Sequence, residues 1–214
     1  MRRYILLFLV LAFSVTCEKE DTLPVFELCD DEYFYYSGGS KIFLKHSLCE
    51  VLIEFEQSDI TAERAKSHLK KFSFINTDHF SVYGHYDKLM VIFNEKCDCN
   101  DFKYYLQELN KDDEIYSATP VFYLSDNDPD SYVILLSEVL TAIDENFISE
   151  SDFINYAQSV NLEFVESQYS TRRFHFKVKE VNTGFEALEI ANQIYESGKV
   201  QYSHPNFISK IVLH

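Results

Sequence analysis

The sequence is poor in glycine, proline and basic residues, and it has no hydrophobic run long enough to cross a bilayer. Its 214 residues include only five Gly and four Pro, which excludes collagen-like and linker-like chains. Nineteen Lys and Arg stand against 35 Asp and Glu, giving a formal net charge of −16. A surface of this sign repels phosphate backbones and anionic lipid headgroups, which argues against binding to nucleic acids or to membrane surfaces in general.

The remaining composition is that of a folded protein. Hydrophobic residues make up 46% of the chain and charged residues 25%, which excludes disorder over most of its length. Nineteen Phe and fifteen Tyr supply bulky side chains for a core. A chain of this length has room for one large domain or two small ones.

Residues 1–17 are typical of an export signal. Two arginines precede a short apolar run over residues 5–13, which has the length of a signal-peptide core. Cys17 follows this run and is itself followed by acidic residues. The pattern resembles a bacterial lipoprotein signal, although Ser14 and Thr16 differ from the usual cleavage box. Cys17 is therefore the expected lipidation site, and ordinary signal-peptide cleavage is the alternative.

Four further cysteines follow Cys17 in the chain: Cys29, Cys49, Cys97 and Cys99. An even number in an exported protein permits disulfides. The Cys-x-Cys spacing of the last two lacks the two-residue gap of zinc and thioredoxin sites, and no His pair accompanies it. Local disulfides or buried thiols are therefore favoured over a metal site, and the pairing stays open.

The sequence contains no nucleophile elbow, phosphate-binding loop, dinucleotide motif or zinc-protease motif. Its seven His are scattered, and none lies four residues from another. A Cys–His catalytic pair between His79 or His85 and Cys97 or Cys99 is conceivable, but the second half of the chain has no counterpart to it. We therefore expect no enzyme and no cofactor.

An acidic stretch over residues 125–131 opens like a calcium-binding loop, with Asp126, Asp128 and Asp130 at alternate positions. The glycine that such a loop needs is replaced by Ser131, and the bidentate acid by Ser137. The stretch therefore indicates a polar linker rather than a metal site.

The two halves of the chain carry the same apolar pattern. Residues 51–72 align with residues 139–160 at an offset of 88, and residues 89–122 align with residues 174–207 at an offset of 85. The three-residue change falls in the middle of the unit, where we expect a hairpin loop to absorb it. Because the apolar stripes stay in register throughout, the pattern indicates a tandem duplication.

Each copy reads as strand, helix, strand, strand, helix, strand. The first helix of copy two begins with the capping signal at Ser149, and the second helices begin with capping signals at Asp98 and Thr183. The second helices are expected to end at Asp113 and Gly198 in left-handed caps. The closing strands are expected to end at their shared proline, which has no N–H to donate.

This order predicts an α+β fold of two tandem ferredoxin-like (βαββαβ) repeats with antiparallel sheets, preceded by an N-terminal β-hairpin. The Tyr-rich strand of that hairpin is expected to pair with or cover a sheet edge. The predicted segments are a lipoprotein signal peptide at 1–17, a tether at 18–30, a β-hairpin at 31–46, repeat 1 at 47–124, an acidic linker at 125–131 and repeat 2 at 132–214.

The closing segments of the copies, residues 114–122 and 199–208, look like the last strand of the pro-region of subtilisin-like serine proteases. The helix over residues 187–198 and the Tyr-rich strand 33–36 are similar to the N-terminal regions of exported bacterial subtilases. The resemblance covers residues 31–214. It departs from the family in two ways, because the unit is doubled and no protease domain follows within the chain.

In that family, the tail after the last strand lies in the protease cleft as a cleaved product would. The resemblance therefore implies a partner-binding tail, made of Ile211, Val212, Leu213 and His214. Ile211 falls four residues from the end, where subtilases favour an apolar side chain. Strand addition with side-chain pockets is a known source of affinity and selectivity.

The combined expectation is a non-enzymatic lipoprotein of the cell envelope, placed at the outer membrane on its surface or periplasmic side. Its only membrane contact would be the lipid anchor, and its partner would be a protein, in the first place a subtilisin-like protease that it inhibits or helps to fold. Three alternatives stay open: an adhesion or scaffolding lipoprotein, the remnant of a broken subtilase gene with no independent activity, and an exported acidic domain with another role.

Overall fold

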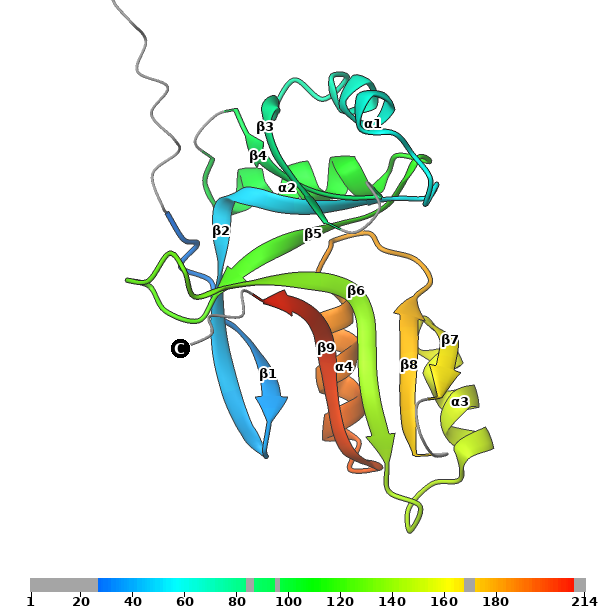
Figure 1. Ribbon diagram of the computed structural model, residues 1–214. Helices are drawn as coiled ribbons and strands as arrows, with labels where there is room; N and C mark the ends of the chain where they lie inside the picture. Colours follow the sequence, from blue (N-terminus) through cyan, green and yellow to red (C-terminus); the bar gives the residue numbers. More distant parts are fainter. Residues whose placement is uncertain (1–26, 84–86, 95–96, 168–171, 210–214) are drawn as a thin grey trace, which may run out of the picture.

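The computed structural model describes residues 27–83, 87–94, 97–167 and 172–209. Within these segments lie four helices and nine strands, and all strand pairs are antiparallel (Figure 1). The expectation of a mixed helix and strand structure with antiparallel pairing is confirmed. The strands form one continuous sheet, however, instead of a separate sheet for each copy.

The first half of the chain begins with a hairpin of β1 (Tyr33–Ser37) and β2 (Ser40–Phe55). The elements that follow are α1 (Ala62–Leu69), β3 (Ile75–Tyr83), β4 (Lys88–Phe93), α2 (Cys99–Asn110) and β5 (Ile115–Tyr123). The strands pair in the order β3-β4-β2-β5. β2 thus belongs both to the hairpin and to the unit behind it, and the predicted boundary at residue 46 lies inside this strand.

The second half repeats this order. Its elements are β6 (Tyr132–Ile143), α3 (Glu150–Ser159), β7 (Leu162–Ser167), β8 (Arg173–Val178), α4 (Glu186–Glu196) and β9 (Val200–Ser209). β7 pairs with β8, β8 with β6 and β6 with β9, which matches the order of the first half. β5 and β6 pair with each other through Val121–Tyr123 and so join the halves. The acidic residues 125–131 lie in the turn between these two strands.

Equivalent strands also pair in the same register. Leu52 of β2 lies opposite Met90 and Thr119 on its two neighbours. Leu140 of β6, 88 residues later, lies opposite His175 and His204, each 85 residues after its counterpart. The offsets read from the sequence therefore reappear as matched strand partners.

The three-residue difference between the halves is not in the hairpin loop, as predicted, but before it. β3 has three unpaired residues, 77–79, where β7 has only Val165. This bulge accounts for two of the three residues. The third lies earlier, because the start of the first helix and the start of the next strand are 13 residues apart in the first half and 12 in the second. A bulge takes up extra residues in one strand while the partner strand keeps its course.

The two shared prolines do not end their strands, contrary to the prediction. Pro120 lies inside β5 opposite Val51, and Pro205 lies inside β9 opposite Val139. In both cases the partner strand has a register shift that ends at this valine. The missing proline N–H therefore falls where the hydrogen-bond ladder is already interrupted.

The helix starts agree with the prediction at Ser149 and Asp98, which cap α3 and α2. At α4 the prediction is wrong, because Thr183 is not the cap. The helix begins at Glu186, whose carboxylate accepts the backbone N–H groups of Asn182, Thr183 and Gly184. Glu186 thus fixes the loop before the helix, and the N-cap residue is Phe185, which makes no side-chain cap hydrogen bond.

The helix ends agree with the prediction at one of two places. Gly198, directly after α4, has a left-handed φ of 69°. Asp113 does not, since α2 already ends at Asn110. Among the described residues, the non-glycine with positive φ is Asn161, at 70°, after α3. An amide side chain tolerates this conformation better than most, and the position was not singled out in the sequence.

The main core is shared by both halves. Residues of all four helices and of the alternate positions of β2 and β6 form one hydrophobic cluster, including Phe102, Phe122, Phe153 and Phe176, all fully buried. A smaller cluster of Leu52, Val121, Tyr123, Ile134 and Leu136 contains no helix residue. Since side chains alternate along a strand, this second cluster lies on the helix-free face of the sheet.

The halves are also joined by specific contacts. The Tyr116 hydroxyl of β5 donates to the carbonyl of Val178 at the end of β8. The hairpin reaches across as well: the Tyr33 ring stacks on Phe185 at 4.6 Å, and Asn192 of α4 donates to the Phe34 carbonyl at 2.7 Å. The Tyr-rich strand β1 therefore packs against α4 and β9 of the second half (Figure 1).

Candidate functional site

The site residues predicted from the sequence, Cys17 and the tail Ile211–His214, lie outside the described residues. Lipidation and tail binding therefore stay predictions. The strand that precedes the tail is described: β9 ends at Ser209, opposite Val133 of β6. Its side chain Ile208 packs against the helix-free cluster at the junction of the two halves.

The helix-free face of the second half forms the candidate binding surface. We call it the β6–β8–β9 face and define it by six residues: Glu138, Leu140, His175, Lys177, His204 and Asn206. Strand pairing places them in two rows, with Leu140 between the two histidines, and with Glu138 opposite Lys177. On each strand the two residues are two positions apart, so their side chains point to the same side of the sheet. Residues opposite each other on neighbouring strands also share a side.

Several of these side chains are held by one another. Asn206 Nδ2 donates to Glu138 Oε2 at 2.7 Å, and His175 Nε2 lies 3.0 Å from the same oxygen. The His204 ring stacks on Tyr202 with 5.3 Å between ring centroids. Fixed polar groups on a rigid sheet suit recognition of another protein, since little side-chain freedom is lost on binding.

A buried carboxylate links this face to the first half. Glu54 of β2 is only 6% exposed and lies 3.1 Å from Lys177 Nζ and 3.3 Å from Lys88 Nζ. The Lys177 ammonium also lies over the Tyr116 ring, 3.4 Å from its centroid. Because the contacts of Lys177 with Glu54 and Tyr116 cross from one half to the other, removing Lys177 should weaken the junction between the halves.

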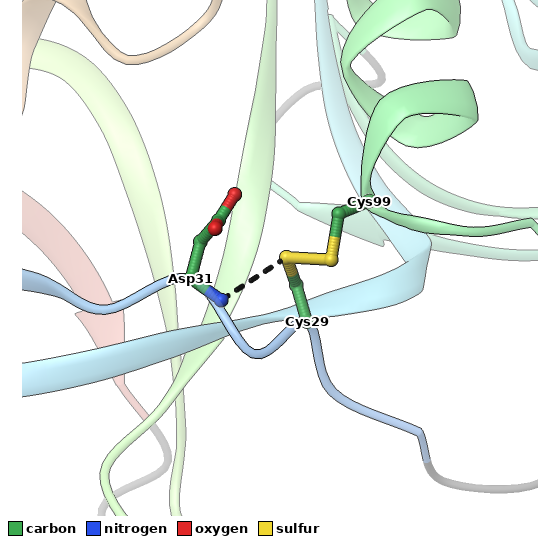
Figure 2. A group of neighbouring side chains, drawn as sticks. All are labelled: Cys29, Asp31 and Cys99. Atoms are coloured by element: carbon green, nitrogen blue, oxygen red, sulfur yellow. Dashed lines mark hydrogen bonds between the residues drawn. A yellow bond between two sulfur atoms is a disulfide. The ribbon is translucent and has the colours of Figure 1, made fainter.

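A second cluster surrounds a disulfide at the base of the hairpin. Cys29 and Cys99 are joined, with their Cα atoms 5.4 Å apart (Figure 2). The prediction of local disulfides is wrong for this pair, since 70 residues separate them. Pairing of the segment before β1 with the middle of β2 brings Cys29 to the start of α2. Asp31, close by, binds Lys103 at 2.5 Å, and this hydrogen bond lowers the pKa of the carboxyl group.

Within the described segments, the group of possible metal ligands that lie close together is Cys29, Asp31 and Cys99, all within 4.8 Å of one another. Both sulfurs are used in the disulfide, so neither has a thiolate to offer a cation. The cluster is therefore a covalent cross-link between the hairpin base and α2. In the acidic turn, Asp126 pairs with Lys45 at 2.9 Å, and Asp128 accepts the N–H of Asp130.

Within the described segments, the conceivable pair of His79 with Cys97 or Cys99 is not assembled. His79 is exposed on β3, where it lines a shallow hollow with Met90. Cys97 is buried in the main core instead and donates to the Leu48 carbonyl. His85 lies outside the described residues.

His46 is a buried polar residue that was not predicted from the sequence. His46 of β2 is fully buried among aromatic rings, stacked on Phe102 at 4.6 Å and 5.7 Å from Phe185. Its Nδ1 lies 2.7 Å from the Ser47 carbonyl, and its Nε2 has no partner. Burial lowers the pKa of His46 to about 4. A histidine alternating with apolar residues in a predicted strand was the available signal.

No protein-family model matches the sequence, and a search of curated proteins gives no significant match. Among the described residues, no helix combines the length and the apolar character needed to cross a bilayer.

Proposed function

We propose that this protein is a non-enzymatic, protein-binding lipoprotein of the cell envelope, built from two tandem ferredoxin-like units that resemble the pro-region of subtilisin-like proteases. The strand orders β3-β4-β2-β5 and β7-β8-β6-β9 support the tandem assignment, because each is the order of a ferredoxin-like unit. The shared registers at Leu52 and Leu140 support an origin by duplication.

The observation that carries the proposal is the different fate of the two closing strands. β5 turns back after Tyr123 and pairs with β6, so its continuation is used inside the sheet. β9 pairs with β6 up to Ser209, which lies opposite Val133. The proposed binding segment, Ile211–His214, comes after β9, and an extended segment of this kind can add to a partner as a strand.

The β6–β8–β9 face, which includes two residues of β9, is the proposed contact surface that accompanies the tail. Its histidines, Lys177 and Asn206 stand on strands of the sheet, and Glu138 accepts a hydrogen bond from Asn206. A protease that received the tail in its cleft would meet this face with the surface beside the cleft. The tail would then supply affinity through strand addition, and the face would supply selectivity.

An inhibition assay tests the proposal. The full chain is titrated against a panel of exported subtilisin-like proteases, alongside a variant that lacks Ile211–His214. We expect inhibition of at least one protease by the full chain and its loss in the shortened variant. The matched control is Tyr104→Ser, which alters an exposed side chain of α2 on the helix side and should inhibit like the parent. Equal potency of the shortened variant would refute the role of the tail.

A scaffolding or adhesion role is the second candidate, and the ordered face favours it, since that face exists without the tail. It predicts an envelope partner that binds the shortened variant as well as the full chain. The substitutions His175→Ala and Asn206→Ala should weaken this binding, whereas Tyr104→Ser should not.

The proposed location is supported by the Cys29–Cys99 disulfide, since such cross-links persist in oxidising compartments. Metabolic labelling with a palmitate analogue tests the anchor. The parent chain should carry the label, and Cys17→Ala should not. Label on neither protein would leave only ordinary export.

A further inference from the structure

Two cysteines that take no part in the disulfide lie beside it. Cys49 is in β2 and Cys97 lies two residues before the start of α2, and their exposed fractions are 9% and 4%. Both belong to backbone segments that the Cys29–Cys99 bond already ties together. The N–H of Cys29 donates to the carbonyl of His46, three residues before Cys49, and Cys99 follows Cys97 by two residues.

The contact between the two segments runs through the backbone of Cys49 itself. The Cys97 thiol donates to the carbonyl of Leu48, which is the peptide group joined to Cys49. The Cys49 thiol lies 3.6 Å from the Ser47 hydroxyl, whose oxygen also accepts the N–H of Cys49. The Cys97 thiol is therefore hydrogen-bonded to the peptide group that adjoins Cys49, and the Cys49 thiol lies in the same stretch of β2.

We propose that Cys49 and Cys97 are a dithiol pair that closes to a second disulfide in this protein. The two segments are already cross-linked at Cys29–Cys99, so the new bond needs little backbone movement. Closure also removes two thiols from the core. Burial raises the pKa of both thiols, and burial together with the charge of Cys49 raises that of Cys97 to about 12.

A low-molecular-weight disulfide, such as oxidised glutathione, is a sufficient oxidant. The thiolate of one cysteine attacks a sulfur of the reagent, which forms a mixed disulfide and releases one glutathione thiolate. The second cysteine then attacks the protein sulfur of that mixed disulfide, forms the Cys49–Cys97 bond and releases the other glutathione thiolate. The two protons lost by the cysteines end on the two glutathione molecules. Because the thiolate is the attacking species, the reaction should be faster at alkaline pH.

The test is mass spectrometry on the full chain. The protein is incubated with or without oxidised glutathione, at neutral and alkaline pH and with urea below the unfolding transition. It is then acid-quenched, unfolded, treated with N-ethylmaleimide and digested without reduction. Without oxidant, we expect adducts on Cys49 and Cys97. With oxidant, we expect no adducts on either of these two residues and a cross-linked Cys49–Cys97 peptide, whose mass is lower by about 2 Da than that of its uncross-linked parts because two hydrogens are removed.

The variants Cys49→Ala and Cys97→Ala are the controls. Each keeps one thiol, which should hold a glutathione that it cannot release as a disulfide. Near-ultraviolet circular dichroism identifies any variant that fails to fold, and the parent protein alone still decides the outcome. Adducts on both cysteines after oxidation in every condition would overturn the proposal. A cross-link from Cys97 to Cys29 or Cys99 would overturn it too.

Discussion

At the scale of single residues, the stability of the fold should be sensitive to two buried positions, His46 and Gly184. His46 buries an imidazole nitrogen without a partner among aromatic rings. Gly184 brings its backbone so close to β5 that a Cβ would lie 2.4 Å from the carbonyl oxygen of Ala118. His46 should make the free energy of unfolding depend on pH, and Gly184 should tolerate no side chain without a loss of stability.

The His46 prediction follows from its lowered pKa. The folded protein holds the imidazole neutral down to about pH 4, whereas the unfolded chain protonates it near 6.5. The unfolded state therefore binds more protons in that window, and stability falls as the pH falls from 6.5 to 4. The loss is about 3 kcal/mol for this group. Urea midpoints at neutral pH and at pH 4 should show a larger drop for the parent than for His46→Leu. Equal drops would show that other groups account for the pH dependence.

The Gly184 prediction compares two glycines with positive φ. Gly184→Ala meets both the strained backbone, at φ 84°, and the Ala118 carbonyl, so we expect a loss of about 3 kcal/mol or more. Gly198→Ala has a similar φ of 69° but open space around it, and should lose only about 1 kcal/mol. Chemical denaturation of both variants gives the comparison. A smaller loss at Gly184 than at Gly198 would contradict the close approach between the halves.

At the scale of elements, the alternation of apolar residues was sufficient to locate strands and helices, and local chemistry predicted the caps at Asp98 and Ser149. The strand ends were mispredicted at Pro120 and Pro205, because the bulges that accommodate them belong to the partner strands. The role of Glu186 was missed, since three loop N–H groups converge on its carboxylate only in the folded loop. The disulfide was beyond the sequence as well, because its geometry depends on strand pairing around His46.

The Cys29–Cys99 disulfide should contribute strongly to the free energy of unfolding. Removing it through Cys29→Ser with Cys99→Ser frees a loop of 70 residues in the unfolded chain, which costs about 4 kcal/mol in the chain-entropy model. The thermal and urea midpoints of the double variant should match those of the parent in reductant. Unchanged midpoints would mean that the segment before β1 adds nothing to the fold.

At the scale of the whole molecule, the halves are distinct in topology but not in packing. One hydrophobic cluster includes core residues of both, and the contacts of Tyr116 and Glu54 cross the junction. Sequence periodicity could reveal two units, yet it could not show that β5 and β6 would merge them into one sheet. The candidate surface was equally hidden, since its residues come together only through the registers of β6, β8 and β9.

This shared core predicts cooperative unfolding. Because neither half buries its apolar residues alone, both should unfold in one transition. Urea unfolding can be followed by tyrosine fluorescence and by far-ultraviolet circular dichroism. The two curves should coincide, and Tyr116→Phe should lower both midpoints together. Two separate transitions would indicate that the halves are independent domains.

The central claim is that the chain binds a subtilisin-like protease at its cleft, and calorimetric titration against such proteases tests it most directly. Each protease is measured free and with a covalent peptide inhibitor filling the cleft. The account predicts that the chain binds a free protease and loses this binding when the cleft is occupied. Binding that is the same with the cleft filled, or no binding to any free protease in the panel, would contradict it.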